Sequence, residues 1–338
     1  MRADERSRQR GVALLVVLLI VAMMTTVAVA MSDRLFVNFQ RAERQLRYQQ
    51  AFWYSQGVEA LAEVGLKESF KDNDKVTLNQ PWAVKDQTYP LDLGTATGSV
   101  YDRQACYNVN ALNNVGTPEN GQLPYEVAVL QRLFENLELD GYQAETAAAS
   151  VWEFVDGDNS VQTALGVEDS HYEGQAVPYV TANGPLADNT ELRAINGISA
   201  KIYNEVAPML CAVPSDKLNV NINTLTEEEA PLLAALTSIS TDQAKELIEG
   251  RPYEGWDDVD SFLAEPALAS LEEKAREQIK PHLDVTSHFF ELDALIEVDK
   301  TTLRLRTLLA RGEGGNIETV RRRFGGMRER DSDDTSEQ

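Results

Sequence analysis

The sequence has few of the residue patterns on which enzymes depend. Its three histidines, His171, His282 and His288, do not form an H-E-x-x-H zinc motif. It contains no G-x-S-x-G elbow, no Walker A loop and no G-x-G-x-x-G loop after a strand. Acidic pairs are so common in this chain that a pair alone does not indicate a glycosidase. We therefore expect no catalytic activity.

Cysteine is nearly absent, because Cys106 and Cys211 are the only two in 338 residues. This excludes a disulfide-dense scaffold, and we predict a single Cys106–Cys211 disulfide formed in an oxidising compartment. Such a bond closes a loop of about 100 residues and stabilises the fold by up to roughly 4–5 kcal/mol in the chain-entropy model. The alternative is two buried free thiols. A catalytic thiol is not expected, since no histidine lies in a motif that would activate it.

Positive charge is also scarce. The chain has 31 Lys and Arg residues against 54 Asp and Glu residues, which gives a net charge of −23. A protein this acidic is soluble, repels nucleic acid and attracts cations. The composition therefore argues against a nucleic-acid partner.

A long apolar run interrupts this charged chain near its start. Residues 12–31 contain no charged side chain, and about 20 helical residues cross a hydrocarbon core of roughly 30 Å. Four arginines and two acids precede the run, so the positive-inside rule places the N-terminus in the cytoplasm and the remaining chain on the other side. The sequence predicts a single membrane anchor.

A cleavable signal peptide is the alternative, because Ala28-Val29-Ala30 is an A-x-A site. Against it, apolar residues continue at helical spacing through a proline-free stretch, which predicts one helix over 12–66. These apolar positions are Phe36, Phe39, Leu46, Trp53, Leu61 and Val64.

The N-terminal pattern resembles the type IV pilin-like signal, in which a basic leader ends in glycine and an apolar helix follows. In that family prepilin peptidase cuts after the glycine, which implies processing between Gly11 and Val12 here. Pilins usually carry glutamate at the fifth mature position, where this chain has Val16. Among the pseudopilins of the type II secretion system, the protein K family is the one that lacks this glutamate. The chain thus resembles that family.

The resemblance implies a structural role. An intramembrane carboxylate is costly without a partner, and in pilins the partner is understood to be the subunit already above. A subunit without the glutamate suits the first position, so the resemblance implies a minor pseudopilin that caps the periplasmic pseudopilus and helps start its assembly for export of folded proteins. Two smaller minor pseudopilins of the I and J types, the major pseudopilin filament and prepilin peptidase are the implied partners, and the inner membrane the implied location.

The chain beyond residue 66 changes its periodicity twice. Short strands and turns are predicted over 76–111, helices from Pro124 to Lys280 with Gly141 ending the first of them, and a β-hairpin from Phe290 onward. We predict an α+β fold: a long N-terminal membrane and stalk helix packed on a small antiparallel pilin-type sheet, which a large inserted all-α domain interrupts. The predicted boundaries are a leader (1–11), the helix (12–66), a first β part (67–112), the α-domain (113–285), a second β part (286–324) and a disordered tail (325–338).

Two segments of the insert resemble helix-hairpin-helix turns. The first runs from Leu192 to Ile198 around Gly197, and the second, 236–240, lacks the glycine. Such turns bind phosphate in nucleic-acid proteins, usually with nearby Lys or Arg. The second copy has acidic neighbours, which favours a structural role. A membrane-anchored periplasmic binding protein of the DNA-uptake type is the alternative function.

An acidic loop between residues 155 and 188 is the strongest candidate for a ligand site. It contains Asp156, Asp158, Glu168 and Asp169, and clustered carboxylates suit Ca²⁺ better than Zn²⁺. The spacing does not fit an EF-hand, since Val161 stands where the glycine belongs. Residues 166–172 resemble an acidic G-x-E-D-x-x-Y loop of the protein K family, which is reported to bind calcium. The alternative is a solvated acidic loop without metal.

The first residue of the mature protein distinguishes a retained apolar helix from a cleaved signal peptide. Intact-mass analysis of the protein from cells with prepilin peptidase should give Val12 as the first residue. A first residue of Met31 would instead indicate cleavage by signal peptidase.

Overall fold

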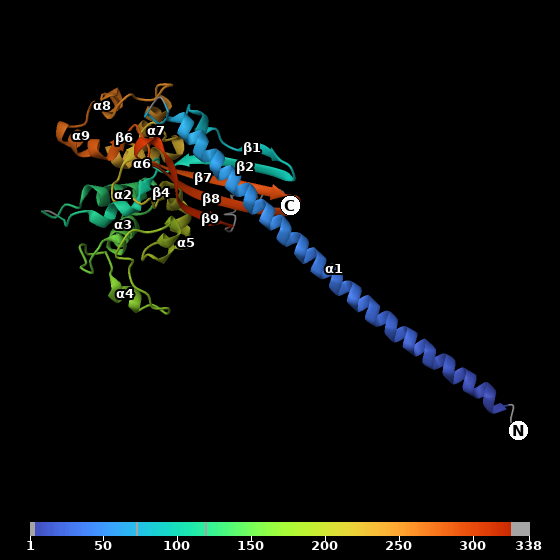
Figure 1. Ribbon diagram of the computed structural model, residues 1–338. Coiled ribbons are helices and arrows are strands. Elements are labelled where there is room, and N and C mark those ends of the chain that lie inside the picture. Colours follow the sequence, from blue (N-terminus) through green and yellow to red (C-terminus); the bar gives the residue numbers. More distant parts are fainter. Residues whose placement is uncertain (1–3, 72–73, 119, 326–338) are drawn as a thin grey trace.

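The computed structural model describes residues 4–71, 74–118 and 120–325, with the side chains of residues 4–11 and 313 left aside. A long helix lies across one face of a five-stranded sheet, and a helical unit is attached at the end of the sheet furthest from the N-terminus (Figure 1). The prediction of an α+β fold with a long N-terminal helix and a helical middle region is confirmed.

Helix α1 runs without interruption from Asp4 to Ser69. In the part of the chain that the structure describes, it alone is long and apolar enough to cross a membrane, with a mean hydropathy of 2.9 in its most apolar window. Its first half projects away from the rest of the molecule (Figure 1). Its second half packs on the sheet through Ala51, Ser55, Glu59 and Leu66, which are buried and recur at spacings of four or seven residues.

The sheet is antiparallel, with strand order β1-β2-β7-β8-β9. Its strands are β1 (Gln87–Leu91), β2 (Gly94–Asp102), β7 (Phe289–Val298), β8 (Thr301–Arg311) and β9 (Ile317–Phe324). The predicted hairpin is β7 and β8, whose alternating apolar residues face α1. Asp299 in its turn has a φ of 52°, a left-handed conformation that suits a two-residue hairpin turn.

Helices dominate the chain between β2 and β7. The elements are η2 (Val109–Asn114), α2 (Tyr125–Asn136), α3 (Gly141–Val155), α4 (Asp169–Glu173), η3 (Asn189–Ala194), α5 (Ala200–Val206), η4 (Ala207–Met209), η5 (Glu227–Glu229), α6 (Ala230–Thr237), α7 (Thr241–Glu249), α8 (Val259–Leu263), η6 (Pro266–Leu268), α9 (Glu273–Ile279) and η7 (Lys280–His282). Outside this stretch, η1 (Pro81–Ala83) precedes β1 and η8 (Glu313–Gly315) precedes β9. The insert also has two short parallel pairs, β3 (Tyr107–Asn108) with β4 (Leu210–Cys211) and β5 (Val220–Asn221) with β6 (Leu283–Asp284). It is therefore mainly, but not entirely, helical.

Three local predictions differ from the structure. No strand forms at Val76, whose N–H instead donates to the Val285 carbonyl at 2.9 Å. Gly141 does not end a helix: α2 stops at Asn136, and Gly141 is the first residue of α3 after the N-cap Asp140. The first β part ends at Asp102 in the main sheet, since Tyr107 already packs in the core of the helical unit.

The two units have separate cores that meet where β2 ends. One core lies between α1 and the sheet, and the other fills the helical unit. At the junction, buried Asp102 accepts hydrogen bonds from the Thr224 hydroxyl (2.5 Å), the Ser287 hydroxyl (2.6 Å) and the Gln104 N–H (2.8 Å). Burial raises the pKa of Asp102, although these hydrogen bonds oppose the rise.

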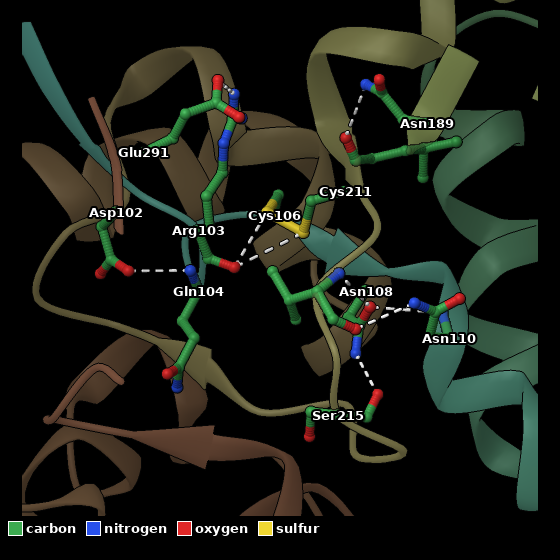
Figure 2. Close-up of a disulfide and its surroundings, with 12 residues drawn as sticks. Asp102, Arg103, Gln104, Cys106, Asn108, Asn110, Asn189, Cys211, Ser215 and Glu291 are labelled. Atoms are coloured by element: carbon green, nitrogen blue, oxygen red, sulfur yellow. Dashed lines mark hydrogen bonds and ion pairs between the residues drawn. A yellow bond between two sulfur atoms is a disulfide. The ribbon is translucent and has the colours of Figure 1, made fainter. Parts of the chain in front are cut away.

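A disulfide joins Cys106 to Cys211 beside this junction (Figure 2). It links the chain just after β2 to strand β4, 105 residues later. Around it, the Asn108 and Asn110 side chains donate to backbone carbonyls of the segment 213–217, including Ser215 and Val213. The bond therefore fixes the entry into the helical unit.

A buried carboxylate fastens α1 to the edge of the sheet. Glu59 accepts hydrogen bonds from the Thr307 hydroxyl (2.7 Å), the Thr319 hydroxyl (3.1 Å) and the Arg322 Nε (2.7 Å). Burial alone would raise the pKa of Glu59, but the hydrogen bonds and the charge of Arg322 lower it below its usual value.

Replacing this carboxylate tests the contact. Glu59→Gln should lower the free energy of unfolding of the full chain in detergent by about 2 kcal/mol, because it removes a charge-assisted hydrogen bond at a buried position. Because the pKa of Glu59 is depressed in the folded state, this difference should be present at pH 7 and disappear as the pH falls through that pKa. Glu63→Gln, whose side chain accepts a bond only from Thr319, should change stability by less than about 0.5 kcal/mol in the same urea titration. An equal loss for both variants would contradict the role given to Glu59.

Candidate functional site

Two carboxylates of the acidic loop meet a third from helix α3. Glu153 lies in the last turn of α3, Asp156 directly follows that helix, and Glu168 precedes α4 as its N-cap. One ligand oxygen from each lies within 4.8 Å of the others. Helices α3 and α4 thus hold the ends of a 13-residue loop, so that Asp156 and Glu168 converge on Glu153.

The triad is buried, and most of its oxygens lack a hydrogen-bond donor. Exposed fractions are 0% for Glu153, 7% for Asp156 and 5% for Glu168. Glu153 Oε1 accepts from the N–H groups of Gln162 (2.7 Å) and Thr163 (3.1 Å). Among the described residues, no donor reaches Glu153 Oε2, Asp156 Oδ1 or either Glu168 oxygen. Buried unpartnered carboxylate oxygens are rare in native proteins and indicate a missing cation or water.

The mutual repulsion of these groups is visible in their pKa values. Burial, together with Glu153 and Asp158, raises the pKa of Asp156 to about 7. Burial and the charges of Asp156, Glu153 and Asp169 raise the pKa of Glu168 to about 8. Burial also raises the pKa of Glu153. A cation among the three would reverse these shifts, because it favours the ionised carboxylates.

Gly166 makes the close packing of this loop possible. A Cβ atom at this position would lie 2.4 Å from Glu153 Oε1 and 2.5 Å from Glu153 Cγ. Only glycine lets the backbone pass so near the carboxylate.

The structure brings together two of the four predicted ligands. Asp156 and Glu168 belong to the triad, whereas Asp158 and Asp169 lie beside it. Asp169 accepts from the Thr181 N–H (2.9 Å) and hydroxyl (2.6 Å), which lowers its pKa. Asp158 accepts from the Ser160 N–H at 2.7 Å. Both still contribute negative charge to the site.

The predicted ligands do not include Glu153, which is the most buried member of the triad. The available signal was its place in the run Val151-Trp152-Glu153-Phe154-Val155, where a carboxylate stands alone among large apolar side chains. A charge buried in such a setting needs a partner, which made it a candidate ligand.

The chemistry of the triad suits a hard cation. Three carboxylates without histidine or cysteine match the oxygen ligands of Ca²⁺ and Mg²⁺ and not the nitrogen and sulfur ligands of structural zinc. The site can therefore hold a metal ion, and neutralising the triad would lock the loop between α3 and α4.

The helix-hairpin-helix-like segments pack inside the helical unit. Gly197 has a φ of +81°, and a Cβ there would lie 3.4 Å from the Ala147 backbone of α3. In the second segment Ser238 takes the left-handed conformation (φ 59°) between α6 and α7. Nearby, Glu227 pairs with Lys245 at 2.9 Å. Tight packing and acidic neighbours make these turns structural elements.

At the other end of the molecule, the predicted processing site lies within α1. Val12 and Val16 are exposed on the projecting half of the helix. The side chains of residues 1–11, including the predicted leader, lie outside the described residues.

Comparison with known proteins gives a consistent result along the chain. The family "Type II secretion system (T2SS), protein K" matches residues 105–215 and 220–286. The chain is 38% identical over 328 residues to the type II secretion system protein K of Aeromonas hydrophila, covering 94% of this chain and 98% of that protein. It is 36% identical over 329 residues to that of Pectobacterium carotovorum, covering 96% and 98%.

A solved structure agrees with these relatives. A chain in the crystal structure of the GspK-GspI-GspJ complex from the enterotoxigenic Escherichia coli type 2 secretion system superposes with a TM-score of 0.79 at 39% identity, covering 85% of this chain and 99% of that one. These proteins are structural components of a secretion machine and not enzymes. With this similarity extending over the sheet, the helical unit and the stalk, the chain belongs to the type II secretion system protein K family of minor pseudopilins.

Proposed function

We propose that this protein caps the tip of the periplasmic pseudopilus and helps to initiate its assembly for export of folded proteins across the outer membrane. Val16 carries the proposal: the apolar half of α1 has no carboxylate that would need a partner in a subunit above. A subunit of this kind begins a filament and does not extend one.

The position of the helical unit supports the same arrangement. It lies beyond the pilin-type sheet, at the end of the molecule opposite the membrane half of α1 (Figure 1). Because α1 is the axis along which pilin-like subunits pack, a bulky unit at its far end is accommodated above the filament. Prepilin peptidase would release the leader after Gly11, leaving the inner-membrane anchor with the bulk of the chain in the periplasm.

The stalk offers a surface for partner subunits. Phe39, Leu46 and Trp53 recur every seven residues on α1 with exposed fractions of 71%, 65% and 71%. This apolar row lies outside the predicted membrane span, so water contacts it until other helices cover it. The solved relative was crystallised with GspI and GspJ, and we propose that the corresponding smaller minor pseudopilins cover this row here.

Co-purification tests this assembly. The chain from residue 32 onward should be recovered with its I- and J-type partners, and a Leu46→Glu/Trp53→Glu variant should reduce recovery of the partners at least about tenfold, since it places two charges in an apolar contact. Tyr253→Glu, at a position 82% exposed in the helical unit, is the matched control and should leave recovery unchanged. Isolation of a lone monomer with both partners present would overturn the assembly.

For the carboxylate triad we propose that Ca²⁺ is the resident cation. Glu153, Asp156 and Glu168 would hold it, and the negative charge of Asp158 and Asp169 would add to its attraction. Ca²⁺ tolerates irregular oxygen ligation in a loop, whereas Mg²⁺ requires near-ideal octahedral geometry. The ion would stabilise a loop of the helical unit that has little secondary structure of its own.

Thermal unfolding with and without chelator measures this contribution. Ca²⁺ at about 100 times its dissociation constant should add about 2.7 kcal/mol and raise Tm by about 5–10 °C. Glu168→Gln should abolish most of the calcium-dependent rise, while Glu173→Gln, an exposed acid of α4, should keep it. A Tm that chelation does not change would eliminate the metal site.

The pH dependence of the chelated protein provides an independent test. The folded-state pKa values of about 7 for Asp156 and about 8 for Glu168 exceed unfolded values near 4. The folded state therefore binds more protons than the unfolded state. The contribution of these two groups to the free energy of unfolding should be largest below about pH 4 and should be lost as the pH rises through about 7–8. Glu168→Gln should flatten this decline in the chelated protein, and saturating Ca²⁺ should remove it. A chelated wild-type protein whose stability is constant from pH 5 to 8 would contradict the repulsion.

A further inference from the structure

The buried face of α1 continues below the sheet as a basic surface. Ala51 and Ser55 are buried against the sheet. Steps of three or four residues back along the helix from Ala51 lead to Tyr48, Arg44 and Arg41 on the same side. Arg41 and Arg44 are exposed, and neither has an ion pair with any residue that the structure describes.

The next arginine along the stalk shows how this part of α1 is neutralised. Arg47 forms ion pairs with Glu43 on the same helix and with Asp299 in the β7–β8 turn. Arg44 and Arg41 lie three and six residues before Arg47 on the helix, and neither pairs with an acid among the described residues. They are positive charges in a protein that is strongly acidic overall.

Strand β9 ends beside the part of α1 that carries these arginines. Phe324 at the end of β9 packs on Phe52 of α1, with ring centroids 5.2 Å apart. The Gly325 N–H donates to the Arg304 carbonyl at 2.9 Å, so the chain leaves the sheet beside the helix. Arg44 is eight residues before Phe52, which is about 12 Å along the helix, and Arg41 is about 17 Å away.

The end of the chain has the complementary charge, although Arg328 and Arg330 precede it in the sequence. Residues 326–338 lie outside the described residues, and from residue 331 onward they include Asp331, Asp333, Asp334 and Glu337 without any Lys or Arg. The seven residues 325–331 can span about 23–25 Å when extended. The acidic segment thus reaches both arginines without moving any described element.

We propose that the acidic segment 331–337 docks on α1 at Arg41 and Arg44, below the sheet. The contact is electrostatic and exposed to solvent, so it is modest in strength and sensitive to salt. It covers a positive surface about 15 Å beyond the predicted membrane span, where anionic lipid headgroups would otherwise attract it. The inference concerns this chain's own surface and is independent of the proposed tip position and of the metal.

Disulfide trapping in the full chain, reconstituted in zwitterionic nanodiscs, tests the contact. The two native cysteines are bonded to each other, so a Ser332→Cys/Tyr48→Cys pair reports on the tail. At low salt it should cross-link about fivefold faster than Ser332→Cys/Leu46→Cys. Leu46 lies on the other side of α1 and is more exposed than Tyr48, 65% against 49%, so accessibility alone would favour the control. The preference should vanish at 1 M salt, where the Debye length is about 3 Å.

Variants that lack the charges test whether electrostatic attraction, and not proximity alone, causes the cross-linking preference. Asp331→Asn/Asp333→Asn/Asp334→Asn should abolish the preference, and so should Arg41→Gln/Arg44→Gln. Persistence of the preference in these variants, or its absence in the parent protein, overturns the proposal. Its loss in nanodiscs that contain phosphatidylglycerol would also overturn it, because lipid phosphate would then be the occupant.

Discussion

The packing of one helix face against one sheet is the interaction on which the rest of this structure depends. The same continuous helix is apolar on all sides over residues 12–31 and buries one face against the sheet from Ala51 onward. Because the helix is unbroken across this change, the sheet and everything attached to it are held in a fixed direction relative to the apolar segment.

The buried carboxylates of this molecule have three different kinds of surroundings. Glu59 is neutralised by Arg322, so its pKa falls. Asp102 is surrounded by hydroxyl and amide donors at the junction of the two units, and burial raises its pKa. The triad has neither a cationic side chain nor enough donors. The first two arrangements are complete within the described chain, whereas the third could hold a metal ion.

The elements that the sequence predicts correctly are those whose pattern lies within a short stretch of the chain. The apolar run and the two-residue alternation of β7 are each defined by residues close together in the chain, and the structure contains both. The errors share a different cause. Gly141 was read as a helix stop, but a glycine can equally begin a helix when an N-cap such as Asp140 precedes it. The absence of a strand at Val76 depends on its contact with Val285, more than 200 residues away.

The sequence by itself determined the long apolar helix, the α+β class, the acidic loop and the resemblance to a family, because composition and periodicity are properties of neighbouring residues. Only the tertiary structure decided which carboxylates converge. It added Glu153, and it left Asp158 and Asp169 outside the triad, because the packing of α3 and α4 and the close approach of Gly166 set the distances. The pairing of Glu59 with Arg322 across 263 residues likewise follows from the order of the strands. Spacing along a chain does not encode such distances, since they arise when separate elements pack together.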